Sequence, residues 1–214
     1  MSTKTDGSPP RQRDSDATRG RILKAARREF ARLGYGGARI DAIAERANAN
    51  KRMIYHYFGG KEALFTAVLE EAYLDIRQAE QRLKLADLEP EAAMDRLVEF
   101  TWRYYLRNPE FLSLVNSENL HRARHVRKST AIRKSFPPFV EMVQSIIDRG
   151  VEKGVFREGV DAVQLNITIA AIGYYYLTNR HTGSVIYERD FMDKAALDER
   201  LEFNRETIRR MLVA

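Results

Sequence analysis

The segment 51–58 carries side chains that are suited to binding nucleic acid. If it forms a helix with ~100° between residues, Ile54 and Phe58 lie together on one face, which we expect to be buried. The opposite arc is basic, aromatic and able to form hydrogen bonds, with Arg52, Met53, Tyr55 and His56. A helix that needed only to be soluble would usually carry Glu and Lys there. A helix of this kind fits the major groove of B-DNA, which is ~12 Å wide.

Lys61 gives an independent indication of the same chemistry. It follows Gly59-Gly60 and begins the next predicted helix, where the helix dipole disfavours a cation. A bound phosphate would resolve this conflict, because the lysine and the helix N-terminus attract the same anion. Lys61 is therefore a candidate phosphate contact.

Short helices before residue 51 must position these groups. Apolar residues recur three or four positions apart in 16–33 and again in 40–47, which predicts two helices. Asn48 tolerates the left-handed conformation of a tight turn, and Asn50 is a suitable N-cap for the third helix. Three short helices with a tight turn before the third predict a helix-turn-helix.

The charge distribution agrees with a polyanionic partner. The net charge is +8 in residues 1–61 and −2 in residues 62–214, for a total of +6. Residues 1–15 are polar, with Pro9-Pro10 and no periodicity, and are predicted to be a flexible basic arm. Because only part of the positive charge lies in this arm, the helices of 16–62 should carry the rest to the partner.

The remaining residues, 63–214, predict further helices and no sheet. Period-2 alternation and hairpin turns are missing from the sequence. We expect helices from Lys61 to about Leu85, from Pro90 to about Asn108, and from Pro109 through Leu120 to Ser135, followed by a break at Pro137-Pro138. Further helices are predicted over Phe139–Lys153, Asp161–Asn179 and Asp193–Leu212. The predicted fold class is all-α, with an N-terminal helix-turn-helix domain and a C-terminal helical domain.

Residues 17–68 resemble the DNA-binding domain of the tetracycline-repressor (TetR) family of bacterial regulators. The similar residues are Ile43-Ala44 before the turn, Tyr55-His56-Tyr57-Phe58 after it, and Lys61-Glu62 with Leu64. Ile22-Leu23, Phe30 and Gly34-Tyr35 are similar to the first helix of that family. The resemblance implies a regulator that binds a double-stranded DNA operator as a homodimer, most often as a repressor.

The resemblance also implies roles for single residues. Lys51, Arg52 and Met53 match positions that reach base edges, while Tyr55, Tyr57 and Lys61 match positions that hold phosphates; His56 could do either. Three residues depart from the family pattern, and the first is Asn48, which stands where the family has a turn glycine. Ala38 replaces the usual Thr before the second helix, and Arg52 replaces a small residue, so the base preference cannot be transferred from relatives.

Aromatic residues in the C-terminal part predict a pocket for a small molecule. Apolar walls with a few polar groups are typical of such sites. Our candidate ligand residues are Trp102, Tyr105, Asn119, His121, Tyr175 and Asn179. They favour a largely apolar effector, such as an aromatic molecule, with one or two polar groups. The alternative for each residue is an ordinary, satisfied core position.

Other chemistry is less favoured. Glu118, His121 and His125 share one helix face, but the surrounding arginines would repel a metal ion, so a salt-bridged surface is the better interpretation. The sequence has no cysteine, which excludes thiolate ligands and disulfides. We found no catalytic motif and predict neither enzyme activity nor a cofactor.

These observations together predict a cytoplasmic, ligand-responsive transcriptional regulator. The longest apolar stretch, Leu165–Leu177, is shorter than the ~20 residues of a membrane span, and the first residues do not resemble a secretory signal. One helix-turn-helix reads few base pairs, so a homodimer is expected, through the last two long helices, with Ile169 and Ile208 as probes. The alternatives are a regulator without an effector, or a helical enzyme whose N-terminus only resembles this motif.

Overall fold

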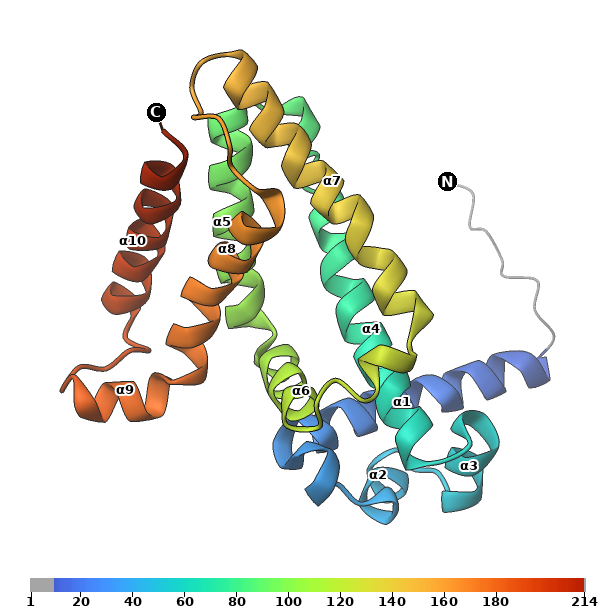
Figure 1. Cartoon of the computed structure of the whole chain (residues 1–214). Coiled ribbons are helices and arrows are strands. Elements are labelled where there is room, and N and C mark those ends of the chain that lie inside the picture. The colour runs from blue at the N-terminus through green and yellow to red at the C-terminus, as the bar shows by residue number, and fades with distance from the viewer. Residues whose placement is uncertain (1–9, 214) are drawn as a thin grey trace, which may run out of the picture. The chain divides into compact units, whose positions relative to one another are not determined.

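The computed structural model describes residues 10–213, which contain ten α-helices, two short 3-10 helices and no strand (Figure 1). The all-α fold class predicted from the sequence is confirmed. The described residues form two compact units. Unit 1 contains the described residues up to Glu71 together with Ser113–Ser129, and unit 2 contains Ala72–Leu112 and the described residues from Thr130 onward.

Unit 1 contains the helix-turn-helix. Its helices are α1 (Pro10–Gly37), α2 (Ile40–Arg46) and α3 (Lys51–Phe58), followed by the first half of α4 (Lys61–Gln81). Helix α2 packs on both α1 and α3. The core of the unit is apolar and tightly closed, with Ile22, Phe30, Ile43, Ile54 and Phe65 fully buried.

The structure corrects the predicted start of the first helix. Of the predicted flexible arm, residues 1–9 lie outside the described residues, whereas residues 10–15 belong to α1. Pro10 stands at the first helical position, where a fixed φ and a missing amide hydrogen cost nothing. Gly34, with a positive φ of 68°, makes a kink inside α1, which extends to Gly37.

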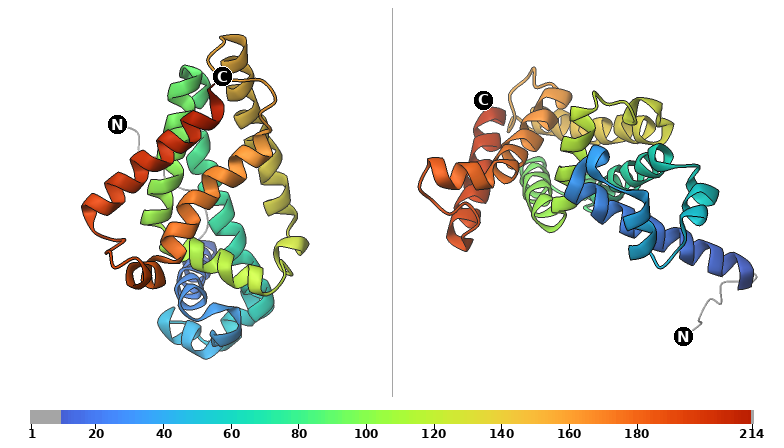
Figure 2. Two further views of the ribbon diagram at one scale, coloured as in Figure 1. Left: turned by 60° about the vertical axis from the view of Figure 1, so that its left-hand side comes forward. Right: turned by 90° about the horizontal axis from the view of Figure 1, so that it is seen from below.

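Unit 2 is a bundle of long helices. It contains the second half of α4, the 3-10 helix η1 (Leu85–Asp87), α5 (Pro90–Arg107) and the start of α6 (Pro109–Leu120). It continues with α7 (Thr130–Glu152), α8 (Ala162–Thr178), α9 (Arg180–Ile186) and α10 (Lys194–Leu212). Helix α5 packs against α7, α8 and α10, and Figure 2 shows α10 beside α5 and α8 from two further directions.

The predicted break at Pro137-Pro138 is wrong. Helix α7 continues through both prolines, and the chain instead breaks after α6, where Arg122 and Ala123 adopt left-handed φ values of 58° and 56°. The 3-10 helix η2 (Val126–Lys128) lies within this break. A buried carboxylate at Glu118 stabilises the turn by accepting main-chain hydrogen bonds, and periodicity alone does not predict such a contact.

Candidate nucleic-acid interface

Helix α3 is held by local interactions that the sequence predicted. Asn48 has the left-handed φ of 48° that the turn requires, and the Asn50 side chain accepts a hydrogen bond of 2.9 Å from the Met53 amide. Gly59 ends the helix with a left-handed φ of 80°. Ile54 is completely buried, and Phe58 is half-buried with the Arg19 guanidinium 5.1 Å from its ring centre. These contacts fix which face of α3 points away from the core.

The outward face of α3 is exposed, as the helical wheel predicted. Arg52 and His56 are exposed, and half of the Tyr55 surface is accessible. Met53 and Tyr57 are half-buried at its edges, and the rings of His56 and Tyr57 lie 5.1 Å apart. The Arg52 side chain has no hydrogen bond or ion pair with any residue that the structure describes. Its five donors are therefore available for an acceptor outside the chain.

Lys51 differs from Arg52 because it has a partner within the unit. Its Nζ lies 3.0 Å from a carboxylate oxygen of Asp41 on α2, and both side chains are exposed. The hydrogen bond and the charge of Asp41 raise the pKa of Lys51. Asp41 therefore competes with any phosphate or base for this ammonium group, a competition that single-residue matching to a motif does not reveal.

Lys61 is also partly engaged. Its Nζ donates a 3.4 Å hydrogen bond to the Gly36 main-chain oxygen and lies 4.9 Å from the centre of the Tyr35 ring. Partial burial lowers the pKa of Lys61. The predicted phosphate contact would require the ammonium group to leave, or to share, these two partners.

Residues 113–129 are an unexpected part of unit 1. The Tyr35 amide donates to Ser117 Oγ at 2.9 Å, and the Tyr35 ring lies 4.8 Å from the His125 ring. The Glu118 carboxylate accepts hydrogen bonds from the amides of His125 and Val126 and lies 2.7 Å from His125 Nδ1. Two exposed ion pairs, Arg124–Glu62 and Lys128–Glu62, join the same segment to α4.

These contacts give the histidine cluster a structural role. Glu118 and His125 are buried and paired with each other, and His121 Nδ1 lies 2.7 Å from the Ser117 main-chain oxygen. Among the described residues, no group of three or more His, Cys, Asp or Glu side chains could hold a metal ion. The expected salt-bridged surface is wrong for Glu118 and His125, because their interaction lies inside the core.

The six predicted ligand residues are divided between the two units. Asn119 and His121 belong to unit 1, whereas the other four belong to unit 2. Trp102 and Tyr105 are buried against Gly173, where an added Cβ would lie 3.6 Å and 3.4 Å from their rings. Asn119 and Asn179 each donate to a main-chain oxygen of their own helix, those of Val115 and Tyr175.

Tyr175 lines a half-open groove of about 550 Å³ in unit 2. The groove is aromatic, and Tyr176 and Phe191 stack at 4.5 Å between ring centres. Arg200 lies 5.3 Å from the Tyr176 ring centre and 5.2 Å from that of Phe203. The groove-lining residues are Tyr175, Tyr176, Tyr187, Arg189, Phe191, Ala196, Glu199, Arg200 and Phe203.

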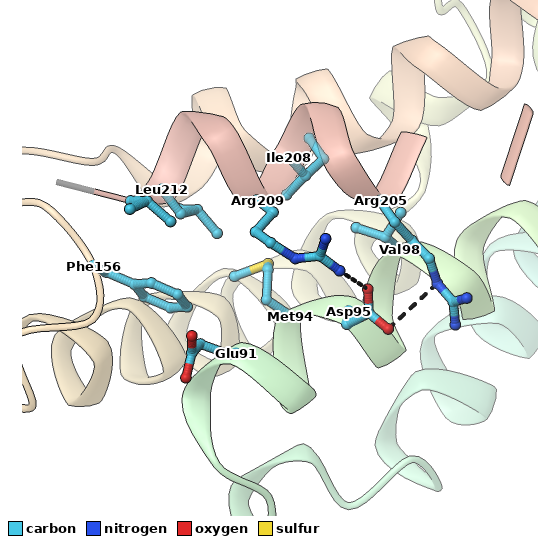
Figure 3. A pocket seen from close by; sticks show the side chains of 10 residues that line it. Glu91, Met94, Asp95, Val98, Phe156, Arg205, Ile208, Arg209 and Leu212 are labelled. Carbon is cyan, nitrogen blue, oxygen red and sulfur yellow. Dashed lines mark ion pairs between the residues drawn. The ribbon is translucent and has the colours of Figure 1, made fainter. Parts of the chain in front are cut away.

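A second hollow shows how α10 is attached to α5. It has a volume of about 30 Å³, and Asp95 of α5 pairs there with Arg205 at 3.3 Å and Arg209 at 3.6 Å (Figure 3). Ile208 lines the same hollow and is 1% exposed, and Ile169 is 3% exposed. Both isoleucines lie in the core of unit 2, so the choice of these two residues as probes of a dimer surface is wrong.

The three-helix head with its capped, exposed α3 defines a helix-turn-helix DNA-binding protein. Two family descriptions match the chain: "Bacterial regulatory proteins, tetR family" over residues 22–68, and "Tetracyclin repressor-like, C-terminal domain" over residues 90–208. The chain therefore belongs to the TetR family of transcriptional regulators and is not an enzyme.

Curated relatives and solved structures agree with this assignment. The HTH-type transcriptional repressor NicS of Pseudomonas putida is 42% identical over 193 residues, which cover 90% of this chain and 91% of NicS. The repressor SCO4008 of Streptomyces coelicolor is 36% identical, covering 75% of this chain and 78% of its own. A TetR family regulator from Marinobacter aquaeolei has the same fold, with a TM-score of 0.71, 20% identity, and coverage of 95% of this chain and 98% of that one.

Proposed function

We propose that this protein is a repressor that binds a two-half-site operator as a homodimer and leaves it when a small molecule binds. The exposed face of α3, with an unpaired Arg52, carries the DNA-binding part of the proposal. Lys51, Met53, Tyr55, His56, Tyr57 and Lys61 complete the proposed contact surface. NicS and SCO4008 are both named as repressors, which supports the direction of regulation. A repressor of this type acts in the cytoplasm, and no described helix is long and apolar enough to cross a membrane.

The proposed dimer surface consists of exposed apolar residues on α8 and α10. Val163, Ile167 and Tyr175 recur at multiples of four positions along α8, and Ile167 is 53% exposed. Phe203 and Met211 share one face of α10, and Phe203 is 61% exposed. Apolar stripes on two neighbouring helices can form a four-helix bundle with the same stripes of a second copy.

The effector would act through unit 2. A ligand shifts a conformational equilibrium only by binding one state better than the other. Helices α4 and α6 each contribute residues to both units, so a ligand that moves either helix in unit 2 also acts on unit 1. Two hollows in unit 2 have a volume of only about 30 Å³ each, which supports the alternative of a regulator without an effector, whereas the groove at Tyr175 has room for one.

The test is to isolate binding sites from genomic DNA of the source organism with purified protein and to footprint them. We expect a sequence with two related half-sites whose centres are ~34 Å apart or a multiple of that distance. The parent protein should bind it far more tightly than Arg52→Ala. Recovery of unrelated sequences, bound equally by both proteins, would contradict the proposal. Small molecules are then screened for release of the parent protein from this operator. A compound that releases it identifies an effector-responsive repressor, whereas a regulator without an effector would respond to none.

A further inference from the structure

A buried ion pair ends the apolar face of α4 in unit 2. Phe65, Leu69, Ala72 and Ile76 follow one face of this helix, and Glu80 occupies the next position of the same series. Arg77 Nη2 donates to Glu80 Oε1 at 2.8 Å, and the side chains are only 11% and 3% exposed. Two charged side chains are thus placed where the pattern calls for apolar ones.

The Arg77–Glu80 pair leaves several of its own donor and acceptor atoms without a hydrogen bond. Arg77 Nε, Arg77 Nη1 and Glu80 Oε2 are buried and form no hydrogen bond with any described residue. Each such atom carries an uncompensated desolvation cost. Burial also raises the pKa of Glu80 to about 8, so this carboxyl group is mostly protonated near neutral pH, whereas arginine keeps its charge. The guanidinium therefore keeps two buried donors, Nε and Nη1, that no described residue accepts from.

Aromatic rings surround this charge. The Arg77 guanidinium lies 3.9 Å from the ring centre of Phe139 and 4.9 Å from that of Phe136. The Tyr73 ring lies 6.0 Å from the Phe136 ring, which extends the aromatic wall. A narrow, partly open hollow of about 30 Å³ adjoins Arg77 and Glu80, and Ser135, Pro138, Phe139 and Met142 of α7 line it. An arginine among aromatic rings suits a ligand that is both planar and anionic.

The wall of this hollow includes the weakest turn of α7. Pro137 and Pro138 lie inside the helix, where proline cannot donate the main-chain hydrogen bond and clashes with the preceding turn. Opening α7 at this turn therefore costs less free energy than opening a turn in which every residue donates a main-chain hydrogen bond. The narrow hollow has room for about two water molecules, so a larger ligand would select an open form of this turn.

We propose that Arg77 binds the carboxylate of a planar aromatic acid, whose ring packs against Phe136 and Met142 when α7 opens at Pro137-Pro138. This inference rests on the effector response proposed above and names the chemical class of the effector. Glu80 is a positioning residue that accepts the hydrogen bond from Arg77 Nη2 and leaves Nε and Nη1 available to the ligand. Twofold pairing between guanidinium and carboxylate gives geometric selectivity that a neutral amide cannot match.

Direct binding tests the site without DNA. Benzoate, 4-hydroxybenzoate and 2-naphthoate are titrated into the full-length protein at pH 7 by calorimetry, with the corresponding amides as neutral controls. We expect at least one acid to bind at least ten-fold more tightly than its amide. Arg77→Gln should abolish this preference, whereas Arg82→Gln, an exposed arginine just after the end of α4, should keep it. Circular dichroism establishes that each variant is folded.

A second variant covers the case in which Arg77→Gln does not fold. Glu80→Gln removes the competing carboxyl group and should keep or strengthen the binding of the acid by several fold. The inference is overturned if none of the acids binds, if acids and amides bind equally, or if Glu80→Gln abolishes binding while the variant remains folded. If neutral compounds release Arg77→Gln and the parent from the operator equally well, the proposed binding site for an aromatic acid is wrong, whereas the proposed response to an effector stands.

Discussion

Glu118 and His125 form a buried pair inside unit 1, in which one carboxylate holds both the main chain and the imidazole of the turn after α6. The distances are 2.6 Å to the His125 amide and 2.7 Å to its Nδ1. The same carboxylate also accepts from the Val126 amide at 2.9 Å. Because the His125 ring packs on Tyr35 and Phe65, this pair connects residues 113–129 to the core of the helix-turn-helix.

Replacing Glu118 with alanine should destabilise the protein. The substitution leaves two buried amides and an imidazole without their acceptor, which costs about 1–3 kcal/mol for each lost interaction of this kind. Urea unfolding followed by circular dichroism measures the change. Glu71→Ala is the matched control, because Glu71 is an exposed glutamate of the same unit. Equal midpoints for the two variants would show that the buried pair contributes no stability.

Arg52→Ala should weaken binding to the specific operator by about 1–3 kcal/mol and relax the preference at one base pair. Fluorescence anisotropy with operator and random duplexes measures both effects. Lys61→Ala provides the contrast, because a phosphate contact affects both duplexes and lowers the salt slope by about one unit. If Arg52→Ala weakens binding to both duplexes equally, Arg52 contacts the backbone and not a base.

Asp41→Asn should strengthen binding to any DNA. The substitution removes the 3.0 Å partner of Lys51 and one negative charge next to the recognition helix. Lys51 then becomes free to neutralise a phosphate, so the slope of log affinity against log salt should become steeper by up to about one unit. Asp41→Asn combined with Lys51→Ala is the control and should not show the steeper slope. An unchanged slope in the single variant would place Lys51 away from the phosphates.

Ile167→Asp together with Phe203→Asp should give a folded monomer that no longer binds a two-half-site operator. The charges are introduced on exposed stripes of α8 and α10, so they oppose association with little effect on the core. Light scattering measures the mass, and circular dichroism measures the folding. Ile208→Asp should unfold the protein instead, because that side chain is 1% exposed. If the double variant remains a dimer, the dimer interface does not lie on these two stripes.

The stability of the protein should fall as the pH rises from about 5 to 9, in part through Glu80. Burial raises the pKa of this group from 4.5 to about 8, so the folded state holds the proton more tightly than the unfolded chain. Its contribution is complete below pH 4.5 and is lost as the pH rises through about 8. Glu80→Gln should remove this loss, so the melting temperature of the variant, relative to that of the parent, should increase as the pH rises. If the difference in melting temperature between Glu80→Gln and the parent does not change with pH, the pKa of Glu80 is not raised. Glu71→Gln, at an exposed glutamate, is the control.

The helix-turn-helix was predictable because short-range interactions determine it. Asn50 caps α3 by accepting a hydrogen bond from the amide of Met53, three positions later, and Gly59 ends the helix in the left-handed conformation. Helical periodicity predicts that Ile54 is buried. All of these operate within a few positions of the chain. The face of α3 that carries Arg52 could therefore be recognised before any contact between distant residues was known.

The tertiary structure decided what the longer helices do with their side chains. Ile208 and Phe203 are both apolar residues of α10, yet one packs against α5 and the other is exposed. Glu118 and Arg77 are polar in the sequence and buried in the fold, because rings that are distant in sequence, Tyr35 beside His125 and Phe139 beside Arg77, pack on the two ion pairs. Helical periodicity fixes which residues share a face, but burial depends on which other helix covers that face. This is why the exposed face of α3 followed from the sequence, while the interior ion pairs and the exposed apolar stripes came only from the packing.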